Sequence, residues 1–223
     1  MRNVISSLLI LGWLAVGPAA VADTVQAVKP ANVKLVETAR ARTLLDIRYD
    51  PKYVKLSYPA GDVDPATGVC TDVVIRTFRA ALNFDFQKAV HEDMKRNFSS
   101  YPKNWGLKRA DKNIDHRRVA NLEAFLKRKG ASVPITKKPE DYRPGDIVTW
   151  RLGGRLPHIG IISDEKSDWG TPLVIHNVGG GVVEDDLLFN TDINGHFRFL
   201  PKSNIVLDKK DANVIPASNI VTR

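Results

Sequence analysis

In the first two thirds of the chain, apolar residues recur at intervals of three and four positions, which is the period of one face of an α-helix. The stretch after Cys70 shows this most clearly, because its apolar residues keep the spacing as far as Leu82. The pattern predicts four helices, over residues 32–47, 70–82, 84–98 and 115–129. Asn32 and Asp115 are the expected N-caps of two of these helices. Gly130 is the expected end of the last one.

Beyond Pro144 the apolar residues form short runs bounded by glycine-rich turns, which is typical of β-strands. Five strands are predicted, over residues 146–150, 158–162, 172–176, 182–184 and 195–200. Phe197 and Phe199 are expected on one face of the last strand. Helices followed by an antiparallel sheet give the α+β fold class.

The length of 223 residues suits one well-buried domain better than two. A short basic start, an apolar run and the small residues before Asp23 predict a secretory signal peptide over residues 1–22, cleaved after Ala22. The run is too short to span a bilayer comfortably, so we expect a periplasmic or secreted protein without a membrane anchor. A flexible leader (23–31), one domain (32–201) and a polar tail (202–223) complete the expected organisation.

The chain stays basic without the predicted signal peptide, because that segment removes only Arg2 and leaves 32 Lys and Arg against 25 Asp and Glu. A basic exported protein suits a polyanionic surface such as the cell wall. Nucleic acid fits the charge but not the compartment, so no nucleic-acid partner is expected. A solvated basic surface without any partner fits the charge equally well.

Cys70 is the only cysteine, so the exported chain can form no internal disulfide. It stands where a turn-rich segment becomes a helix. The unpaired N–H groups and the positive dipole end of a helix start favour thiolate over thiol, and the thiolate is the nucleophile. The alternative is a small buried residue at the start of a core helix.

Two histidines are predicted to meet at one edge of the sheet. His158 opens one strand and His176 ends the next, and the start of one antiparallel strand lies beside the end of its neighbour. A helix laid across that edge would bring Cys70 to them. Cysteine, histidine and a third polar group form the arrangement needed for acyl transfer. In this arrangement His158 is the acid and base, and His176 orients its ring.

Four further residues are candidates for substrate binding. Asp72, in the first turn after Cys70, is expected either to cap the helix or to bind a substrate amine. Asp115, His116 and Arg117 open the last helix, where they are either caps or a wall that binds substrate carboxylates through an arginine fork.

Two hypotheses from other functional classes stay open. Cys70, His158 and His176, with His116 as a fourth, form a chemically acceptable zinc set, although no closely spaced pair fixes two ligands locally. The chain also fits a wall-binding module in which the cysteine is simply buried. The hypothesis of thiol hydrolysis requires no cofactor and no metal.

The motifs Pro144-Gly145-Asp146-Ile147-Val148, His158-Ile159-Gly160-Ile161-Ile162 and Val174-Ile175-His176-Asn177 resemble those of the NlpC-type cell-wall peptidases. Tyr58 lies twelve residues before Cys70, as an active-site tyrosine does in that family. The chain resembles more specifically a related exported bacterial family of unknown function. Its marks lie at residues 68–74, 105–107 and 113–119.

The resemblance implies a papain-like fold and thiol hydrolysis of an amide bond in peptidoglycan peptides. Tyr58 is then an oxyanion donor beside the Cys70 N–H. We expect a monomer, although the sequence leaves the oligomeric state open. The chain departs from the NlpC pattern at the nucleophile, where Val-Cys-Thr-Asp replaces Asp-Cys-Ser-Gly, and in the segment 115–117. The scissile bond, the origin of the wall, and the choice between His176 and Asn177 as third group stay open.

Overall fold

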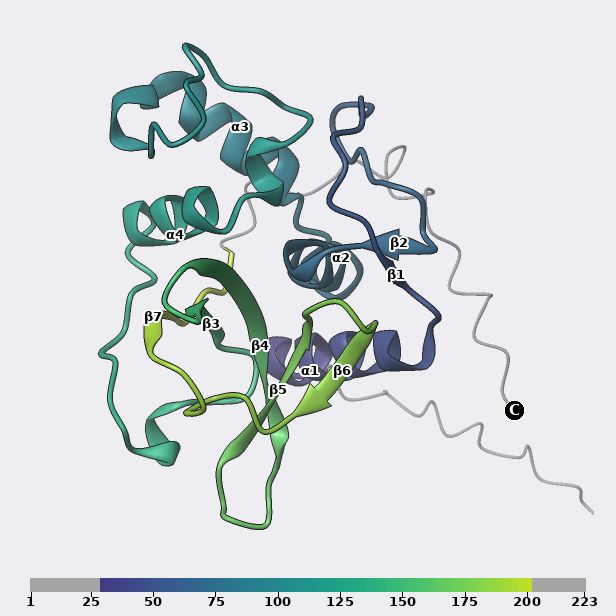
Figure 1. Ribbon diagram of the computed structural model, residues 1–223, viewed down its shortest axis with the longest axis vertical. Helices are drawn as coiled ribbons and strands as arrows, with labels where there is room; N and C mark the ends of the chain where they lie inside the picture. Colours follow the sequence, from purple (N-terminus) through teal and green to yellow (C-terminus); the bar gives the residue numbers. More distant parts are fainter. Residues whose placement is uncertain (1–28, 202–223) are drawn as a thin grey trace, which may run out of the picture.

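Four α-helices and a five-stranded antiparallel sheet make up residues 29–201, the part of the chain that the computed structural model describes (Figure 1). The helices are α1 (Ala31–Ala41), α2 (Cys70–Leu82), α3 (Phe86–Arg96) and α4 (Val119–Arg128). The strands of the sheet are β3 (Ile147–Leu152), β4 (Leu156–Lys166), β5 (Pro172–Asn177), β6 (Val182–Asp185) and β7 (Ile193–Phe197). The short elements are β1 (Arg48–Tyr49), β2 (Thr67–Gly68), η1 (Arg42–Leu44), η2 (Phe98–Ser100), η3 (Asp115–Arg117) and η4 (Pro139–Asp141). This arrangement confirms the α+β class.

The strand order is β6-β5-β4-β3-β7, with every pair antiparallel. Strands β3 to β6 therefore pair with their neighbours in sequence, and β7 returns to the free edge of β3. The two-residue strands β1 and β2 pair in parallel outside this sheet. Because β4 and β5 are adjacent, the predicted pairing of the two histidine strands is confirmed.

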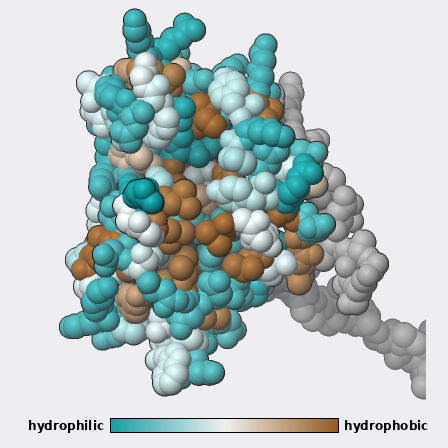
Figure 2. Space-filling view, in the orientation of Figure 1, coloured by the Kyte–Doolittle hydropathy of each residue, from teal (hydrophilic) through white to brown (hydrophobic). Residues whose placement is uncertain are grey.

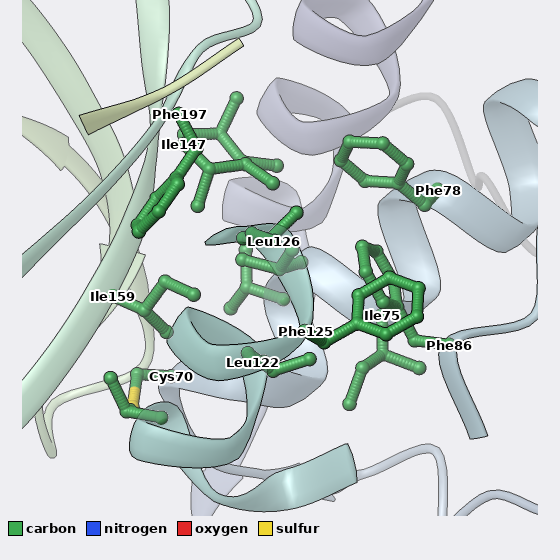
Figure 3. Close-up of a cluster of buried hydrophobic side chains, with 14 of the residues drawn as sticks. Cys70, Ile75, Phe78, Phe86, Leu122, Phe125, Leu126, Ile147, Ile159 and Phe197 are labelled. Carbon is green, nitrogen blue, oxygen red and sulfur yellow. The ribbon is translucent and has the colours of Figure 1, made fainter. Parts of the chain in front are cut away.

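Successive side chains of a strand point to opposite faces of the sheet. Both faces of this sheet carry buried apolar residues. One face packs against α1, α2 and α4 in the main core (Figure 3). Its strand residues are Ile147, Ile159, Ile161, Ile175, Val182 and Phe197. Phe199 packs against the same core, as predicted. The second face carries a smaller cluster of Tyr142, Val148, Trp150, Ile162, Val174 and Leu188.

Helix α2 lies between α1 and strands β4 and β5, and most of its side chains are buried. Its bounds match the prediction, and it ends at Asn83 in the left-handed conformation (φ 53°), which asparagine tolerates better than most residues. At its start, the Asp72 carboxylate accepts the Val69 backbone N–H at 2.7 Å. This bond satisfies the amide of the N-cap residue and fixes the first turn at Cys70.

Two predicted helix starts are wrong. Asn32 lies inside α1, which begins at Ala31 after an extended Pro30, and regular helix stops at Ala41. Asp115 begins a 3₁₀ turn rather than α4, and its carboxylate accepts the Asp111 N–H instead of capping a helix. The Asp115 carboxylate thus bonds a backbone N–H of the preceding loop instead of an N–H of the helix.

The predicted signal peptide (1–22) and tail (202–223) lie outside the described residues, as do residues 23–28 of the predicted leader, and the last leader residue, Ala31, begins α1. Between residues 29 and 201, no helix has the length and apolar character needed to cross a membrane.

Candidate active site

Three polar side chains lie in a row across strands β4, β5 and β6. The His158 Nε2 atom lies 3.0 Å from His176 Nδ1, and His176 Nε2 lies 2.8 Å from Asp185 Oδ1. His176 stands opposite Val183, so Asp185 is its diagonal neighbour on the same sheet face. The structure thus brings together the two predicted histidines and adds a carboxylate that the sequence analysis missed.

The two rings are buried, whereas the carboxylate at the end of the row is not. His158 and His176 are 2% and 1% exposed, and the Asp185 side chain is 54% exposed. Burial lowers the pKa of His158 to about 3, and the neighbouring His176 ring lowers it further. His158 is therefore neutral at physiological pH and is available as a base.

It is His176 that contacts His158, and not its neighbour Asn177. The Asn177 side chain instead accepts the Gly179 N–H at 3.0 Å. The geometry therefore favours His176 as the third group of the site.

Cys70 is the first residue of α2 and lies against β4, beside Ile159 (Figure 3). Burial raises the pKa of its thiol to about 11, although the Ile159 and Thr71 N–H groups act in the opposite direction. The expectation that the helix start favours thiolate is therefore wrong for this state, since desolvation outweighs the helix N–H groups. Cysteine and His158 rest as a neutral pair.

The Cys70 sulfur reaches the backbone of β4, whereas the His158 ring lies on the sheet face that carries Trp150. The sulfur lies against the backbone N–H of Ile159, the residue after His158. Within residues 29–201 no hydrogen bond joins the Cys70 thiol to the His158 ring. Such bonds are often long or poorly aligned before substrate binds, so this geometry does not disqualify the pair.

The ends of β4 and β5 present apolar surface around the buried rings. Leu156, two residues before His158, is 54% exposed, and Val178, two residues after His176, is 51% exposed. Figure 2 shows apolar residues gathered across the middle of one face of the molecule, with polar residues around them.

Gly160 allows the two histidine strands to approach each other. A Cβ atom at this position would lie 2.5 Å from Val174 Cγ1 and 3.2 Å from His176 Cβ. No real Cβ packs this closely, so the strand after His158 requires glycine here.

Gly160→Ala is expected to lower the free energy of unfolding by about 1–3 kcal/mol, because Val174 or β5 must move away. Urea denaturation measures this loss. The matched control is Gly180→Ala, since a Cβ at Gly180 meets nothing within 4 Å. Equal stability of the two variants would contradict the prediction.

Tyr58 does not lie where the prediction placed it. Its hydroxyl is 3.5 Å from Glu92, its ring meets His91 edge-on at 5.2 Å, and Lys112 lies over that ring. None of the contacts found in residues 29–201 joins Tyr58 to Cys70, so the structure gives its oxyanion role no support.

A different tyrosine lies near the thiol. Tyr49 is in β1, paired with Gly68, two residues before Cys70. Burial raises the pKa of its phenol, and the charges of Cys70 and Asp72 raise it further, which places the hydroxyl within their electrostatic reach. No sequence spacing pointed to Tyr49, because its position depends on the pairing of β1 with β2.

Asp72 and Arg117 form a buried ion pair with each other. Arg117 donates from Nε and Nη2 to the two Asp72 oxygens, both at 2.9 Å. The side chain of Arg117 is 2% exposed and that of Asp72 is 4% exposed. Arg117 also donates to the carbonyls of Lys52 and Asp50. The arginine fork predicted for substrate carboxylates is therefore occupied by the protein, and the two residues hold the helix start in place.

Asp115 and His116 are also buried, at 1% and 2% exposure. Burial raises the pKa of Asp115 to about 6 and lowers that of His116 to about 3. The His116 Nδ1 atom has no hydrogen-bond partner in the described structure. These positions do not form the surface wall that the sequence predicted for substrate.

The burial of His116 predicts a loss of stability in acid. The unfolded state takes up the proton near pH 6.5 and the folded state only near pH 3, so stability falls as the pH drops between these values. For His116 the loss should reach about 2–3 kcal/mol at pH 4.5. His158 adds to this loss, and Asp115, whose pKa shift is opposite, offsets part of it.

Comparing His116→Leu with the wild type isolates this contribution. The stability difference between the two proteins, measured by urea denaturation, should shift by about 2–3 kcal/mol in favour of the variant between pH 7 and 4.5. A difference that stays constant with pH would show that His116 is protonated equally in both states.

The zinc alternative finds no support in the arrangement of side chains. In residues 29–201 no three His, Cys, Asp or Glu side chains are grouped so as to hold a metal ion. His116 is not part of the histidine row. The charged groups that act on its pKa are Asp85, Arg79 and Arg117.

Comparison with known proteins places the chain in a family. The model of a domain of unknown function, DUF1287, matches residues 36–199. The chain is also 50% identical over 185 residues to the uncharacterized protein YijF of Escherichia coli (strain K12), covering 83% of this chain and 90% of that protein. The histidine row and Cys70 all lie within the matched residues. The chain belongs to the DUF1287 family.

Proposed function

We propose that this protein is an exported cysteine hydrolase that cleaves an amide bond in peptidoglycan peptides. The observation that carries the proposal is that Cys70, at the start of α2, lies against the strand that carries His158. The sulfur lies against the N–H that follows His158, and His158 is hydrogen-bonded to His176. A nucleophile, a base and a group that orients the base are the parts required for acyl transfer.

The reaction begins from the neutral pair. The Cys70 thiol gives its proton to His158 as the sulfur attacks the carbonyl carbon, and a carbon–sulfur bond forms. His158 then gives this proton to the leaving amine, which departs and leaves a thioester. Water, deprotonated by His158, hydrolyses the thioester and restores the thiol.

The developing oxyanion needs donors near the sulfur. The first-turn N–H groups of α2 have no partner within the helix, and those of Cys70 and Thr71 already act on the sulfur, as does the Ile159 N–H. Tyr49 is the phenolic candidate in place of Tyr58. Donors of this kind typically contribute a factor of about 10²–10³ each.

The finer fold and the substrate class belong to the same proposal. A helix that starts with cysteine and packs on an antiparallel sheet with histidines on adjacent strands is compatible with the papain-like fold of the NlpC-type peptidases. A basic chain with a signal-peptide-like start suits a wall polymer outside the cytoplasm. The exposed apolar residues at Leu156 and Val178 offer contact surface for a peptide.

The proposal is tested by incubating purified peptidoglycan fragments with the protein lacking residues 1–22 and reading the products by mass spectrometry. New fragments that iodoacetamide abolishes and EDTA leaves unchanged support thiol hydrolysis, and their masses identify the bond. Loss of the fragments with EDTA alone would support a zinc hydrolase instead. Binding of the wall polymer without any cleavage would contradict the proposal and support a binding module.

A further inference from the structure

We propose that Asp185 is a positioning residue that fixes the tautomer of His158 through His176. This inference rests on the proposed thiol hydrolysis for its functional meaning. Its structural content, the location of two ring protons, can be measured independently of any substrate.

Hydrogen-bond donors and acceptors must alternate along the row from Asp185 to His158. A carboxylate only accepts hydrogen bonds, so in the neutral form of His176 the 2.8 Å contact with Asp185 requires its single ring proton on Nε2. The Nδ1 atom of His176 is then an acceptor. Its partner at 3.0 Å, Nε2 of His158, must therefore carry the proton of that ring.

The nitrogen left without a proton is His158 Nδ1. It is the ring nitrogen closer to the backbone, and the sulfur of Cys70 lies against the backbone N–H of the next residue, Ile159. The row of contacts therefore leaves His158 Nδ1 as the ring nitrogen that can accept a proton. In the opposite tautomer His158 Nδ1 carries a proton and cannot accept another.

The two histidines alone do not fix which nitrogen of each ring carries the proton. Each histidine ring can donate from one nitrogen and accept at the other, so the pair alone is consistent with protons on both Nε2 atoms or on both Nδ1 atoms. Only an obligate acceptor at the outer end removes the second arrangement. A water molecule in place of Asp185 could donate as well as accept, and would leave both arrangements populated.

The position of Asp185 agrees with a role in aligning the site rather than in folding. It lies on the edge strand β6, its side chain is 54% exposed, and its described contact is the one with His176. Its removal leaves no cavity in the core. The next residue, Asp186, has the same charge on the same strand end, and makes no side-chain contact in the described structure.

The test measures the ring protons of His158 and His176 by long-range ¹H–¹⁵N NMR at pH 7.5, in the wild type, Asp185→Ala and Asp186→Ala. We expect both wild-type rings with the proton on Nε2, a mixture of tautomers in Asp185→Ala, and wild-type spectra in Asp186→Ala. A wild-type His158 with its proton on Nδ1, or an unchanged Asp185→Ala spectrum, would overturn the inference.

Turnover provides the functional readout. Asp185→Ala should lower kcat about tenfold with little change in KM, Asp185→Glu should recover part of the loss, and Asp186→Ala should retain wild-type kcat. The two proposals fail separately. A wild type that shows the expected tautomers but hydrolyses nothing would refute the thiol hydrolase and leave the role of Asp185 in fixing the protons intact.

Discussion

Replacing Arg117 by leucine should lower the free energy of unfolding by about 3–5 kcal/mol, because the change leaves the Asp72 carboxylate buried without its partner. Asp72 is 3% exposed and keeps only one described hydrogen bond, from the Val69 N–H. Arg117 also donates to two carbonyls of the segment before β2, so these lose a donor as well. Urea denaturation of the two proteins measures the loss.

The control for this prediction is an ion pair on the surface. Lys29 and Glu37 are paired with side chains 58% and 47% exposed, and Lys29→Met should change stability by less than about 1 kcal/mol. The double variant Asp72→Leu/Arg117→Leu should recover part of the loss, since no uncompensated charge stays buried. An Arg117→Leu variant as stable as Lys29→Met would show that Asp72 is not held by this pair.

The Asp72–Arg117 pair also explains why these residues looked like binding residues in the sequence. They are charged and close to the cysteine, which are the properties of a substrate-binding group as well as of an anchor. The partner of Asp72 is 45 positions away along the chain, and no local pattern reveals such a contact. The sequence therefore identified the neighbourhood of Cys70 but not the use of these charges.

The elements that sequence analysis located best are those with a strong local period. Helix α2 begins at Cys70 and ends at Leu82 as predicted, and the five strands lie where the short apolar runs placed them. The meeting of His158 and His176 followed from one rule, that strands with a short connection pair side by side. The order of the strands in the sequence was therefore sufficient to predict that the two histidines meet.

The residues that sequence analysis misplaced depend on contacts between distant segments. Tyr58 was assigned by its spacing from Cys70, but the loop between them turns its ring toward α3. Tyr49 reaches the neighbourhood of the thiol through the pairing of β1 with β2, and Asp185 reaches His176 through the register of β5 with β6. The short glycine turn between β5 and β6 indicates that these strands pair, but no pattern in a single sequence gives their register or the pairing of β1 with β2.

The charge state of the thiol was mispredicted for an energetic reason. A helix start contributes a fixed but small stabilisation to a thiolate, and that contribution was visible in the sequence. Desolvation of a side chain only 5% exposed is larger and depends on how completely the sheet and helices close around it. An active form of this site must therefore deprotonate Cys70 at the moment of attack and not before.

This requirement makes His158 as necessary as the nucleophile itself. A thiol with a pKa near 11 is almost wholly protonated at pH 7.5, so the sulfur attacks only when a base accepts its proton in the same step. Cys70→Ala should lower hydrolysis of peptidoglycan fragments by at least about 10³-fold, and His158→Ala by about 10²–10⁴-fold. The matched control is His91→Ala on α3, which contacts Tyr58 and should retain activity. Combining the two active-site changes should cost no more than the larger one alone, because the two groups act as a unit. Full activity of Cys70→Ala would remove Cys70 from the reaction, and full activity of His158→Ala would require a different base.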